Sequence, residues 1–182
     1  MRYTARMPVW TVFEPVRGLR LLALAREAGL CRLSILKDDP RTDQAWVDGF
    51  IAGSGEGWLR DPNDPILVEA ARQLTAYFSG SLREFTLPLD LAGTDFQQRV
   101  WKVLRSIPYG QTRSYGWLAA ATGNPRAVRA VGSANARNPA PIVVPCHRVI
   151  AAGGGLQGYA GGLEIKRLLL DLEAHSAAAS AG

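Results

Sequence analysis

The chain has 182 residues, of which 47% are hydrophobic and 20% are charged, and its formal net charge is +5, all ordinary for a folded protein of one large domain or two small ones. No apolar run approaches the ~20 residues of a membrane span, and no compact apolar segment near the N-terminus suggests a secretory signal. The two cysteines and two histidines are widely scattered, which argues against a disulfide framework or a structural zinc site, so we expect no membrane association, no metal, no cofactor and a reducing, cytoplasmic location.

The first half of the chain has the pattern of an α/β domain. Alternating apolar residues and intervening turns predict three short antiparallel strands, at residues 11–13, 19–25 and 30–36. Helical spacing predicts helices at residues 44–50 and 65–79, with a flexible loop at 53–64 between them. Cys31 lies in the third strand, where we expect it to be an ordinary buried residue.

The second half is predicted to be mostly helical. Helices are expected at residues 96–106, capped by Thr94 or Asp95, and at 115–122, 126–137 and 163–174, and the second of them is capped by Ser114. The break at Gly123 between two of them is typical of a helix-turn-helix. Residues 151–162 form a glycine-rich loop, and residues 176–182 are predicted to be a disordered tail.

The charge differs between the two halves. Residues 1–91 carry 11 Lys+Arg and 12 Asp+Glu, whereas residues 92–182 carry 10 Lys+Arg and only 4 Asp+Glu. A basic half favours a polyanionic partner, although charge alone is equally consistent with a merely basic surface.

A reactive cysteine is indicated by the stretch VVPCHRVI, residues 143–150. Its β-branched residues predict a short, buried, extended segment. Cys146 is followed by His147 and Arg148, which are residue types that favour a thiolate. Adjacent side chains of an extended segment point to opposite faces, so we expect a bridging water rather than a direct hydrogen bond between Cys146 and His147. The alternative is a buried structural cysteine beside an unrelated histidine.

The predicted helix at 126–137 has a face of small residues. Arg129, Gly132, Ser133 and Ala136 share this face, while Val128 and Val131 lie opposite and are expected in the core. Small residues allow a helix to approach a narrow groove closely but read no bases, and a single arginine could fill the space of a displaced base. Tight packing between helices is the alternative explanation.

These segments together resemble a known family. Four motifs within residues 93–173 are similar to those of the O6-alkylguanine-DNA alkyltransferases (methylated-DNA–protein-cysteine methyltransferases): GTDFQQRVWKVLRSIPYGQTRSYGWLA, GNPRAVRAVGSANARNP, PCHRV and GYAGGLEIKRLLLDLE. The resemblance implies a ribonuclease-H-like α/β domain at 1–91 and a mostly α, winged-helix-like domain with the helix-turn-helix at 92–175. It also implies a monomer that binds the minor groove of double-stranded DNA, singly or cooperatively, without regard to sequence.

The implied reaction is direct reversal of DNA damage. O6-alkylguanine, and O4-alkylthymine as well, would be flipped out of the duplex, and the alkyl group would pass irreversibly to Cys146, once per molecule. His147 would act as the base, Glu173 would orient it, Asn138 would fix the loop before the cysteine, and Tyr115 would rotate the nucleotide and protonate the guanine. The residues expected to contact DNA are Tyr115, Ala127, Arg129, Ala130, Gly132, Ser133 and Arg137. The residues expected to form the alkylated-base pocket are Pro141, Val149, Tyr159, Ala160 and Gly161.

The sequence departs from the family at two points. Many members have a serine where Ala160 stands, so here only a backbone N–H can hold O6, and positioning of bulky adducts is in question. Some members bind zinc in the N-terminal half, where this chain offers only Cys31. Three other functions fit the sequence less well: a cysteine peptidase, for which no oxyanion hole is indicated; a lesion-binding relative, which would lack the cysteine; and a helix-turn-helix regulator, which would need base-reading side chains.

Overall fold

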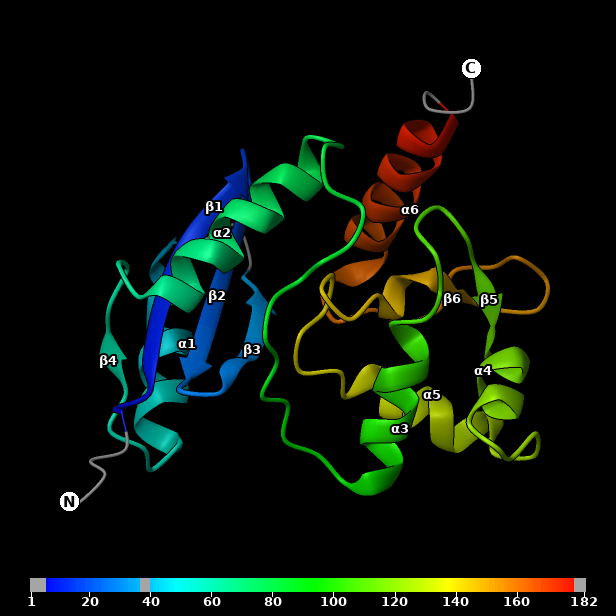
Figure 1. Ribbon diagram of the computed structural model, residues 1–182, viewed down its shortest axis with the longest axis horizontal. Coiled ribbons are helices and arrows are strands. Elements are labelled where there is room, and N and C mark those ends of the chain that lie inside the picture. Colours follow the sequence, from blue (N-terminus) through cyan, green and yellow to red (C-terminus); the bar gives the residue numbers. More distant parts are fainter. Residues whose placement is uncertain (1–5, 37–39, 179–182) are drawn as a thin grey trace. The chain divides into compact units, whose positions relative to one another are not determined.

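The computed structural model describes residues 6–36 and 40–178, and the chain forms two compact units that divide between Leu91 and Ala92. The first unit is α/β and the second is mostly helical, as predicted (Figure 1). The elements of the first unit are β1 (Val9–Val16), β2 (Leu19–Arg26), β3 (Gly29–Ile35), α1 (Pro40–Gly53), β4 (Leu59–Arg60) and α2 (Pro65–Phe78). Those of the second are α3 (Asp95–Leu104), β5 (Arg113–Ser114), α4 (Tyr115–Ala121), α5 (Val128–Ala136), the 3-10 turn η1 (Cys146–Arg148), β6 (Val149–Ile150) and α6 (Gly162–Ala178).

The sheet of the first unit is mixed, with the strand order β3–β2–β1–β4. β1 and β3 both pair with β2 in antiparallel fashion, but β4 pairs with β1 in parallel. The three strands predicted from the sequence are therefore antiparallel, as expected, and the parallel edge strand β4 was not predicted. β4 lies in the segment predicted to be a loop. The strand could not be predicted from the sequence because it has only two residues, both exposed, and shows no hydrophobic alternation.

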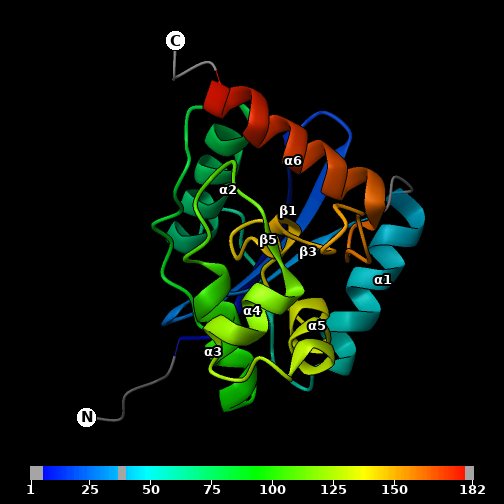
Figure 2. The same cartoon turned by 90° about the vertical axis from the view of Figure 1, so that its right-hand side faces the viewer.

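Helices cover both faces of this sheet. β2 is almost wholly buried, which explains its nearly continuous apolar sequence LRLLALAR. Leu22 and Leu24 pack with Val47 of α1, and the alternate residues of β2 face the opposite side, where α2 lies (Figures 1 and 2). α1 begins at Pro40, four residues before the predicted helix start.

The helices of the second unit begin at local caps. Thr94 forms a reciprocal capping box with Gln97 at the start of α3, and Ser114 accepts a hydrogen bond from the Trp117 N–H at the start of α4. Both α3 and α4 pack on α5, and the indole Nε1 of Trp101 donates to the Ala134 carbonyl at 2.9 Å. This packing holds α5 with one face toward the core.

α5 is shorter than predicted. It begins at Val128 rather than at residue 126, and no side chain caps its start. Val131 is fully buried, but Val128 is 42% exposed, so the expectation that both valines lie in the core was wrong for Val128. Val128 is the first residue of the helix, where its side chain extends beyond the buried face.

The segment around Cys146 is a turn rather than an extended strand. Residues Cys146–Arg148 form the 3-10 turn η1, and only Val149 and Ile150 pair with another strand, β5. The Arg148 N–H donates to the Pro145 carbonyl at 3.1 Å, which closes the turn. The β-branched residues that suggested a strand are buried neighbours of the turn and do not set its backbone.

α6 continues past the predicted helix end at residue 174 to Ala178. The tail expected at 176–182 is therefore helical as far as Ala178, and its remainder lies outside the described residues. None of the helices in the described parts of the chain combines the length and apolar character needed to cross a membrane.

Candidate active site

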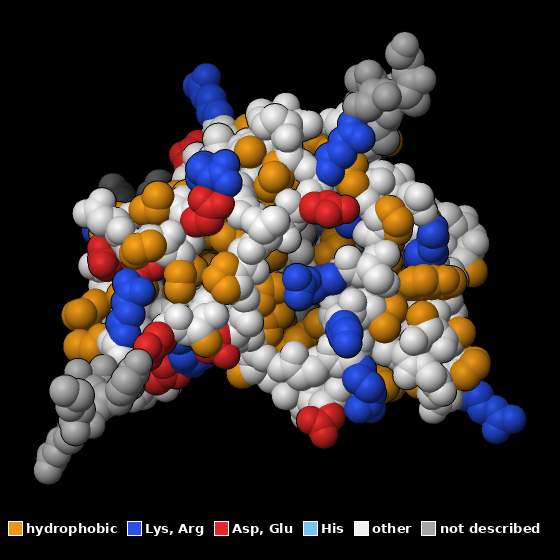
Figure 3. All heavy atoms as spheres, in the orientation of Figure 1, with side chains coloured by type: hydrophobic (Ala, Val, Ile, Leu, Met, Phe, Trp, Pro, Cys, Tyr) orange, Lys and Arg blue, Asp and Glu red, His pale blue; other side chains and the backbone are white. Residues whose placement is uncertain are grey.

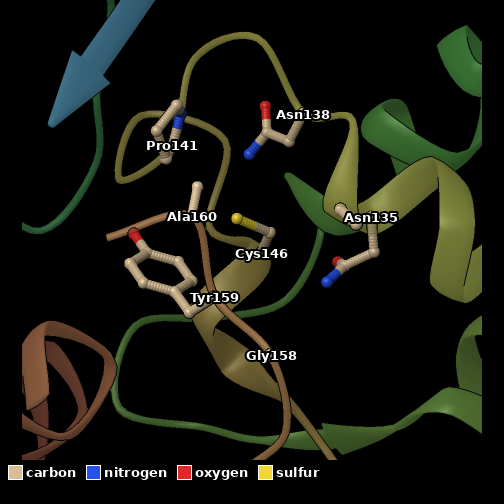
Figure 4. Close-up of a pocket in the computed structure, with 8 residues that line it drawn as sticks. Asn135, Asn138, Pro141, Cys146, Gly158, Tyr159 and Ala160 are labelled. Atoms are coloured by element: carbon tan, nitrogen blue, oxygen red, sulfur yellow. The ribbon is translucent and has the colours of Figure 1, made fainter. Parts of the chain in front are cut away.

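Cys146 lies at a cavity in the second unit. The residue is 4% exposed, and the cavity beside it has a volume of about 260 Å³ (Figure 4). The residues that line the cavity come from α5, from the loop before η1 and from the glycine-rich loop before α6: Asn135, Ala136, Asn138, Pro141, Cys146, Gly158, Tyr159 and Ala160. A buried thiol therefore faces a space large enough for a small organic group.

The loop before Cys146 is held by Asn138. Its Nδ2 donates to the Val144 carbonyl at 2.8 Å, and its Oδ1 accepts from the Ala140 N–H at 3.0 Å. Within the loop, Ile142 has a φ of 77°, a left-handed conformation that β-branched residues rarely adopt. Since such a backbone persists only when its surroundings enforce it, the two Asn138 hydrogen bonds help to hold a strained turn in place.

His147 is bonded to a carboxylate of α6. Its Nε2 lies 2.9 Å from Oε1 of Glu173, and both side chains are almost completely buried. The guanidinium of Arg148 donates to both oxygens of Glu173 at 2.9–3.1 Å, and its Nη1 donates to the Ile107 carbonyl at 2.6 Å. The Gly110 N–H donates to Oε2 at 3.0 Å. Glu173 thus joins η1 to α6 and to the turn after α3.

The electrostatics of this network assign the proton positions. Burial alone would raise the pKa of Glu173, but hydrogen bonds from His147 and Arg148 hold it at about 2, so the carboxylate is ionised. Burial lowers the pKa of His147, against the opposing effect of Glu173, so its imidazole is neutral near pH 7. An ionised carboxylate only accepts hydrogen bonds, so Nε2 of His147 carries the proton. Nδ1 has no hydrogen-bond partner among the described residues and is available as a base.

Cys146 is a thiol in the resting structure. Burial raises its pKa to about 11, against a hydrogen bond from Asn138 and the positive charge of Lys166. The expectation that His147 and Arg148 favour a thiolate was therefore wrong for the resting state. His147 is neutral, and the charge of Arg148 is paired with Glu173.

Two tyrosines flank the thiol. Tyr115 begins α4 and is half-buried, and a Cβ added at Gly132 would lie 3.9 Å from its ring, so α5 and the tyrosine are in close contact. Burial, followed by the nearby charge of an ionised Cys146, raises the pKa of Tyr115, so the phenol keeps its proton. Tyr159 lines the cavity, and its ring meets the His147 ring edge-on with centroids 6.4 Å apart.

The pocket differs in part from the expected one. Pro141, Tyr159 and Ala160 line the cavity, but Val149 and Gly161 are not among its lining residues. The carbonyl of Val149 instead accepts a hydrogen bond from Nζ of Lys166 at 2.8 Å. The same Nζ donates to the Gln157 carbonyl at 2.9 Å and so ties the glycine-rich loop to β6.

Three functional-site residues were missed or misjudged from the sequence. Asn135 and Lys166 were not singled out, and Arg148 was expected to act on the thiol rather than on Glu173. Lys166 and Glu173 are seven residues apart and so share one face of α6 with the buried Leu169. Two charged residues on an otherwise apolar helix face indicate that both side chains are buried and need polar partners there, so this pattern could have identified them.

The small-residue face of α5 lies on the surface. The positions expected to contact DNA are exposed at Arg129, Ala130, Ser133 and Arg137 and partly buried at Ala127 and Gly132. The exposed positions are therefore not packed against α3 or α4, as the alternative explanation would require, whereas Gly132 lies against the Tyr115 ring at the start of α4. α4 and α5 share the face turned to the viewer in Figure 2. No acidic residue occurs between Asp95 and Glu164, and basic side chains are prominent over the second unit in Figure 3.

Cys31 belongs to the sheet of the first unit. Cys31 is buried in β3, and its Sγ lies 3.2 Å from the Leu24 carbonyl, to which it donates. Within the described ranges, no group of three or more His, Cys, Asp or Glu side chains could hold a metal ion.

Comparison with known proteins gives two family matches that cover most of the chain. The family model for the 6-O-methylguanine DNA methyltransferase DNA binding domain matches residues 95–175. The model for the ribonuclease-like domain of 6-O-methylguanine DNA methyltransferase matches residues 20–91.

Individual relatives are similar over most of their length. The methylated-DNA–protein-cysteine methyltransferase of Mycobacterium leprae is 56% identical over 134 residues, which are 74% of this chain and 80% of that protein. The constitutive enzyme of the same name from Bacillus subtilis is 45% identical, with 92% and 96% covered. The crystal structure of Mycobacterium tuberculosis O6-methylguanine methyltransferase aligns with a TM-score of 0.77 at 44% identity, covering 93% and 94% of the two chains. That of Mycobacterium tuberculosis OGT in complex with DNA aligns with a TM-score of 0.75 at 44% identity, covering 94% of each chain.

Proposed function

The chain belongs to the 6-O-methylguanine DNA methyltransferase family, and on that premise we propose that Cys146 is the residue that accepts the methyl group. Close homologues are methylated-DNA–protein-cysteine methyltransferases, and this chain is one of these enzymes, which repair O6-methylguanine in DNA by methyl transfer to a cysteine of the protein. One observation carries the assignment: Cys146 lines the cavity, whereas Cys31 is enclosed in the sheet of the first unit.

The reaction begins with removal of the thiol proton. Because Nε2 of His147 is held by Glu173, we propose that the proton passes from Sγ of Cys146 to Nδ1 through a bridging water molecule. The imidazolium that forms lies against the ionised Glu173, which stabilises its charge. The thiolate therefore exists only during the reaction, consistent with the raised pKa of the resting thiol.

The methyl transfer is a nucleophilic displacement. Sγ attacks the methyl carbon, the S–C bond forms, the bond from carbon to O6 breaks, and the electron pair moves to the guanine. The phenol of Tyr115 donates a proton that neutralises the departing base, and its raised pKa keeps that proton available beforehand. The product thioether has no easy leaving group, so each molecule reacts once.

The chain binds DNA, as a homologue does in its complex structure. We place the exposed small-residue face of α5 in the minor groove, with the protein acting as a monomer and without sequence preference. Arg129 stands on this face among small residues and fills the space that the extruded nucleotide leaves. The same extrusion would admit O4-alkylthymine. A free nucleophilic thiol suits a reducing compartment, so the proposed location is the cytoplasm, at the nucleoid.

A labelled-methyl experiment tests the proposal. Duplex DNA with O6-[³H-methyl]guanine is incubated with wild-type protein, Cys146→Ser and the matched control Cys31→Ser. Wild type and Cys31→Ser should take up at most one methyl group per molecule, with or without a chelator. Cys146→Ser should take up none while still shifting the DNA in a gel. Methyl uptake by Cys146→Ser, or repeated turnover by the wild type, would contradict the assignment.

A further inference from the structure

The exposed side of α3 carries three basic residues in a row. Arg99, Lys102 and Arg105 follow one another at intervals of three residues along the helix and its C-terminal cap, and all three are exposed. Residues three apart are neighbours on a helix surface, so these side chains form one basic stripe. Figure 3 shows basic side chains in a row over α3, on a side of the second unit next to the one that Figure 2 turns to the viewer.

The charges of the basic stripe are not neutralised by acidic neighbours. Among the described residues, neither Lys102 nor Arg105 forms an ion pair or a side-chain hydrogen bond. The guanidinium of Arg99 lies over the Phe96 ring, 5.9 Å from its centroid. The only acidic residue of α3 is Asp95, in its first turn. Three positive charges therefore face solvent along one helix.

The stability of the helix explains only part of the basic stripe. Cations in the last turn interact favourably with the helix dipole, which accounts for Lys102 and Arg105. Arg99 lies in the middle of the helix, beyond the range of that effect. Like charges on neighbouring positions of a helix also repel one another, so the row lowers the stability of the isolated helix. Since folding does not favour the complete row, its charge pattern indicates a polyanionic ligand.

The dimensions of the basic stripe fit a DNA strand. A helix rises about 1.5 Å per residue, so the stripe spans about 9 Å, and one strand presents a phosphate about every 3.4 Å of duplex axis. Three cations can therefore meet about three phosphates. α3 packs directly on α5, and packed helices lie about 8–10 Å apart, whereas one turn of a duplex extends about 34 Å. A duplex seated on α5 thus extends well beyond the width of that helix.

We infer that the basic stripe of α3 is a second DNA contact, which binds phosphates of the duplex on one flank of the segment seated on α5. The inference rests on the proposed placement of α5 on DNA and goes beyond it, because no step at Cys146 uses the stripe. Phosphate contacts carry no sequence information but fix the register and orientation of a protein on the duplex. The stripe therefore adds affinity that falls steeply with salt and does not depend on sequence.

The salt dependence of DNA binding tests the inference. Association constants are measured by fluorescence anisotropy over a series of salt concentrations, with a labelled duplex of about three helical turns centred on O6-methylguanine. Each phosphate contact adds about 0.9 to the slope of log K against log salt. The triple variant Arg99→Gln, Lys102→Gln, Arg105→Gln should therefore lose about 2–3 from that slope. On a duplex of about one turn, which lacks the flanks, wild type and triple variant should give nearly equal slopes.

A control of equal charge isolates the site. Arg17→Gln, Arg60→Gln, Arg72→Gln also removes three exposed arginines, all from the first unit, and should keep the wild-type slope. If thermal unfolding shows that the stripe variant does not fold, the three single variants replace it, each with an expected loss of about 0.9.

Three results would overturn the inference. One is an unchanged slope of the stripe variant on the long duplex, and another is an equal loss of slope in the control variant. The third is an equal loss on both duplex lengths, which would place the contacts within the central turn. A wild type that binds neither duplex would instead refute the proposed placement of α5.

Discussion

Glu173→Gln is the change that tests the buried network most directly. The Glu173 side chain is 1% exposed and accepts hydrogen bonds from His147, from Arg148 and from the Gly110 N–H. Glutamine has nearly the same shape but no charge. The substitution therefore leaves the buried guanidinium of Arg148 without its counter-ion while keeping the packing of α6 against η1.

The expected loss of stability follows from this geometry. Removing one partner of a buried ion pair typically costs about 3–5 kcal/mol, because the remaining charge stays out of water. For a chain of this length, 1 kcal/mol corresponds to roughly 2–4 °C in Tm, so Glu173→Gln should melt about 6–20 °C below wild type. Thermal unfolding followed by circular dichroism at pH 7 measures the shift.

The same change should slow the chemistry. Without the carboxylate, the imidazolium that forms on His147 loses its stabilising charge, and general-base catalysis typically contributes 10²–10⁴-fold. We expect a fall of about 10²-fold or more in the methyl-transfer rate, with duplex DNA and with a free O6-alkylguanine base alike. Rates are measured at a temperature below the Tm of the variant, so that unfolding does not contribute.

A double variant separates the two effects. Glu173→Gln combined with Arg148→Met removes both charges, and replacement of a whole buried pair by neutral groups is often neutral for stability. The double variant should regain most of the lost Tm but none of the lost rate. The control is Glu69→Gln, which breaks an exposed pair with Arg72 and should leave Tm unchanged. A Glu173→Gln variant that melts like wild type, or a double variant that recovers activity, would refute the reasoning.

Three other outcomes are expected. Arg129→Ala should slow repair of O6-methylguanine in duplex DNA markedly and leave the rate of reaction with a free O6-benzylguanine base almost normal. If both rates fall by the same factor, Arg129 has no role in extruding the nucleotide. Glu173 has a pKa of about 2 in the folded protein against 4.5 for the ordinary group, so its stabilising contribution is complete above about pH 4.5 and is lost as the pH falls toward 2. The free energies of unfolding of wild type and Glu173→Gln, measured during acid titration, should therefore converge across that pH window. Parallel curves of stability against pH would contradict the ionised carboxylate. Lys166→Met leaves two carbonyls unpaired, so we expect slower methyl transfer and faster proteolysis in the glycine-rich loop; unchanged proteolysis would show that Lys166 does not anchor the loop.

The helices could be predicted where the signal is local. α3 begins beside Thr94 and α4 beside Ser114, the caps expected from the sequence, because a cap acts on an N–H only two or three residues away. α2 likewise carries its proline at the start. The two-residue β4 has no such signal, since its pairing with β1 depends on a partner some 50 residues away in the chain.

The residues of the site could be predicted from the sequence, but the hydrogen bonds and ion pairs that connect them could not. The resemblance brought Cys146, His147 and Glu173 together, and the structure places the last two in hydrogen-bond contact. The partner of Arg148 could not be found from its neighbours in sequence, because Glu173 lies 25 residues away and is reached only after α6 packs on η1. The turn at Cys146 was missed for a related reason: burial by distant elements, not a strand, explains the β-branched residues around it.

The features that resist prediction are those that cost stability, and they gather in residues 135–148. Ile142 holds a left-handed backbone at a cost of about 1–3 kcal/mol, Oδ1 of Asn135 is buried without a hydrogen-bond partner among the described residues, and Arg148 is a buried charge paired with Glu173. Predictions from propensity and burial assign each residue its most stable local conformation and environment. They therefore fail where the folded chain adopts a less stable one. These three departures lie within fourteen residues of the chain, a segment from which Asn135 and Cys146 line the cavity. Two of them fit the reaction proposed for Cys146, because the strained turn at Ile142 precedes this residue and the buried guanidinium keeps Glu173 ionised against His147.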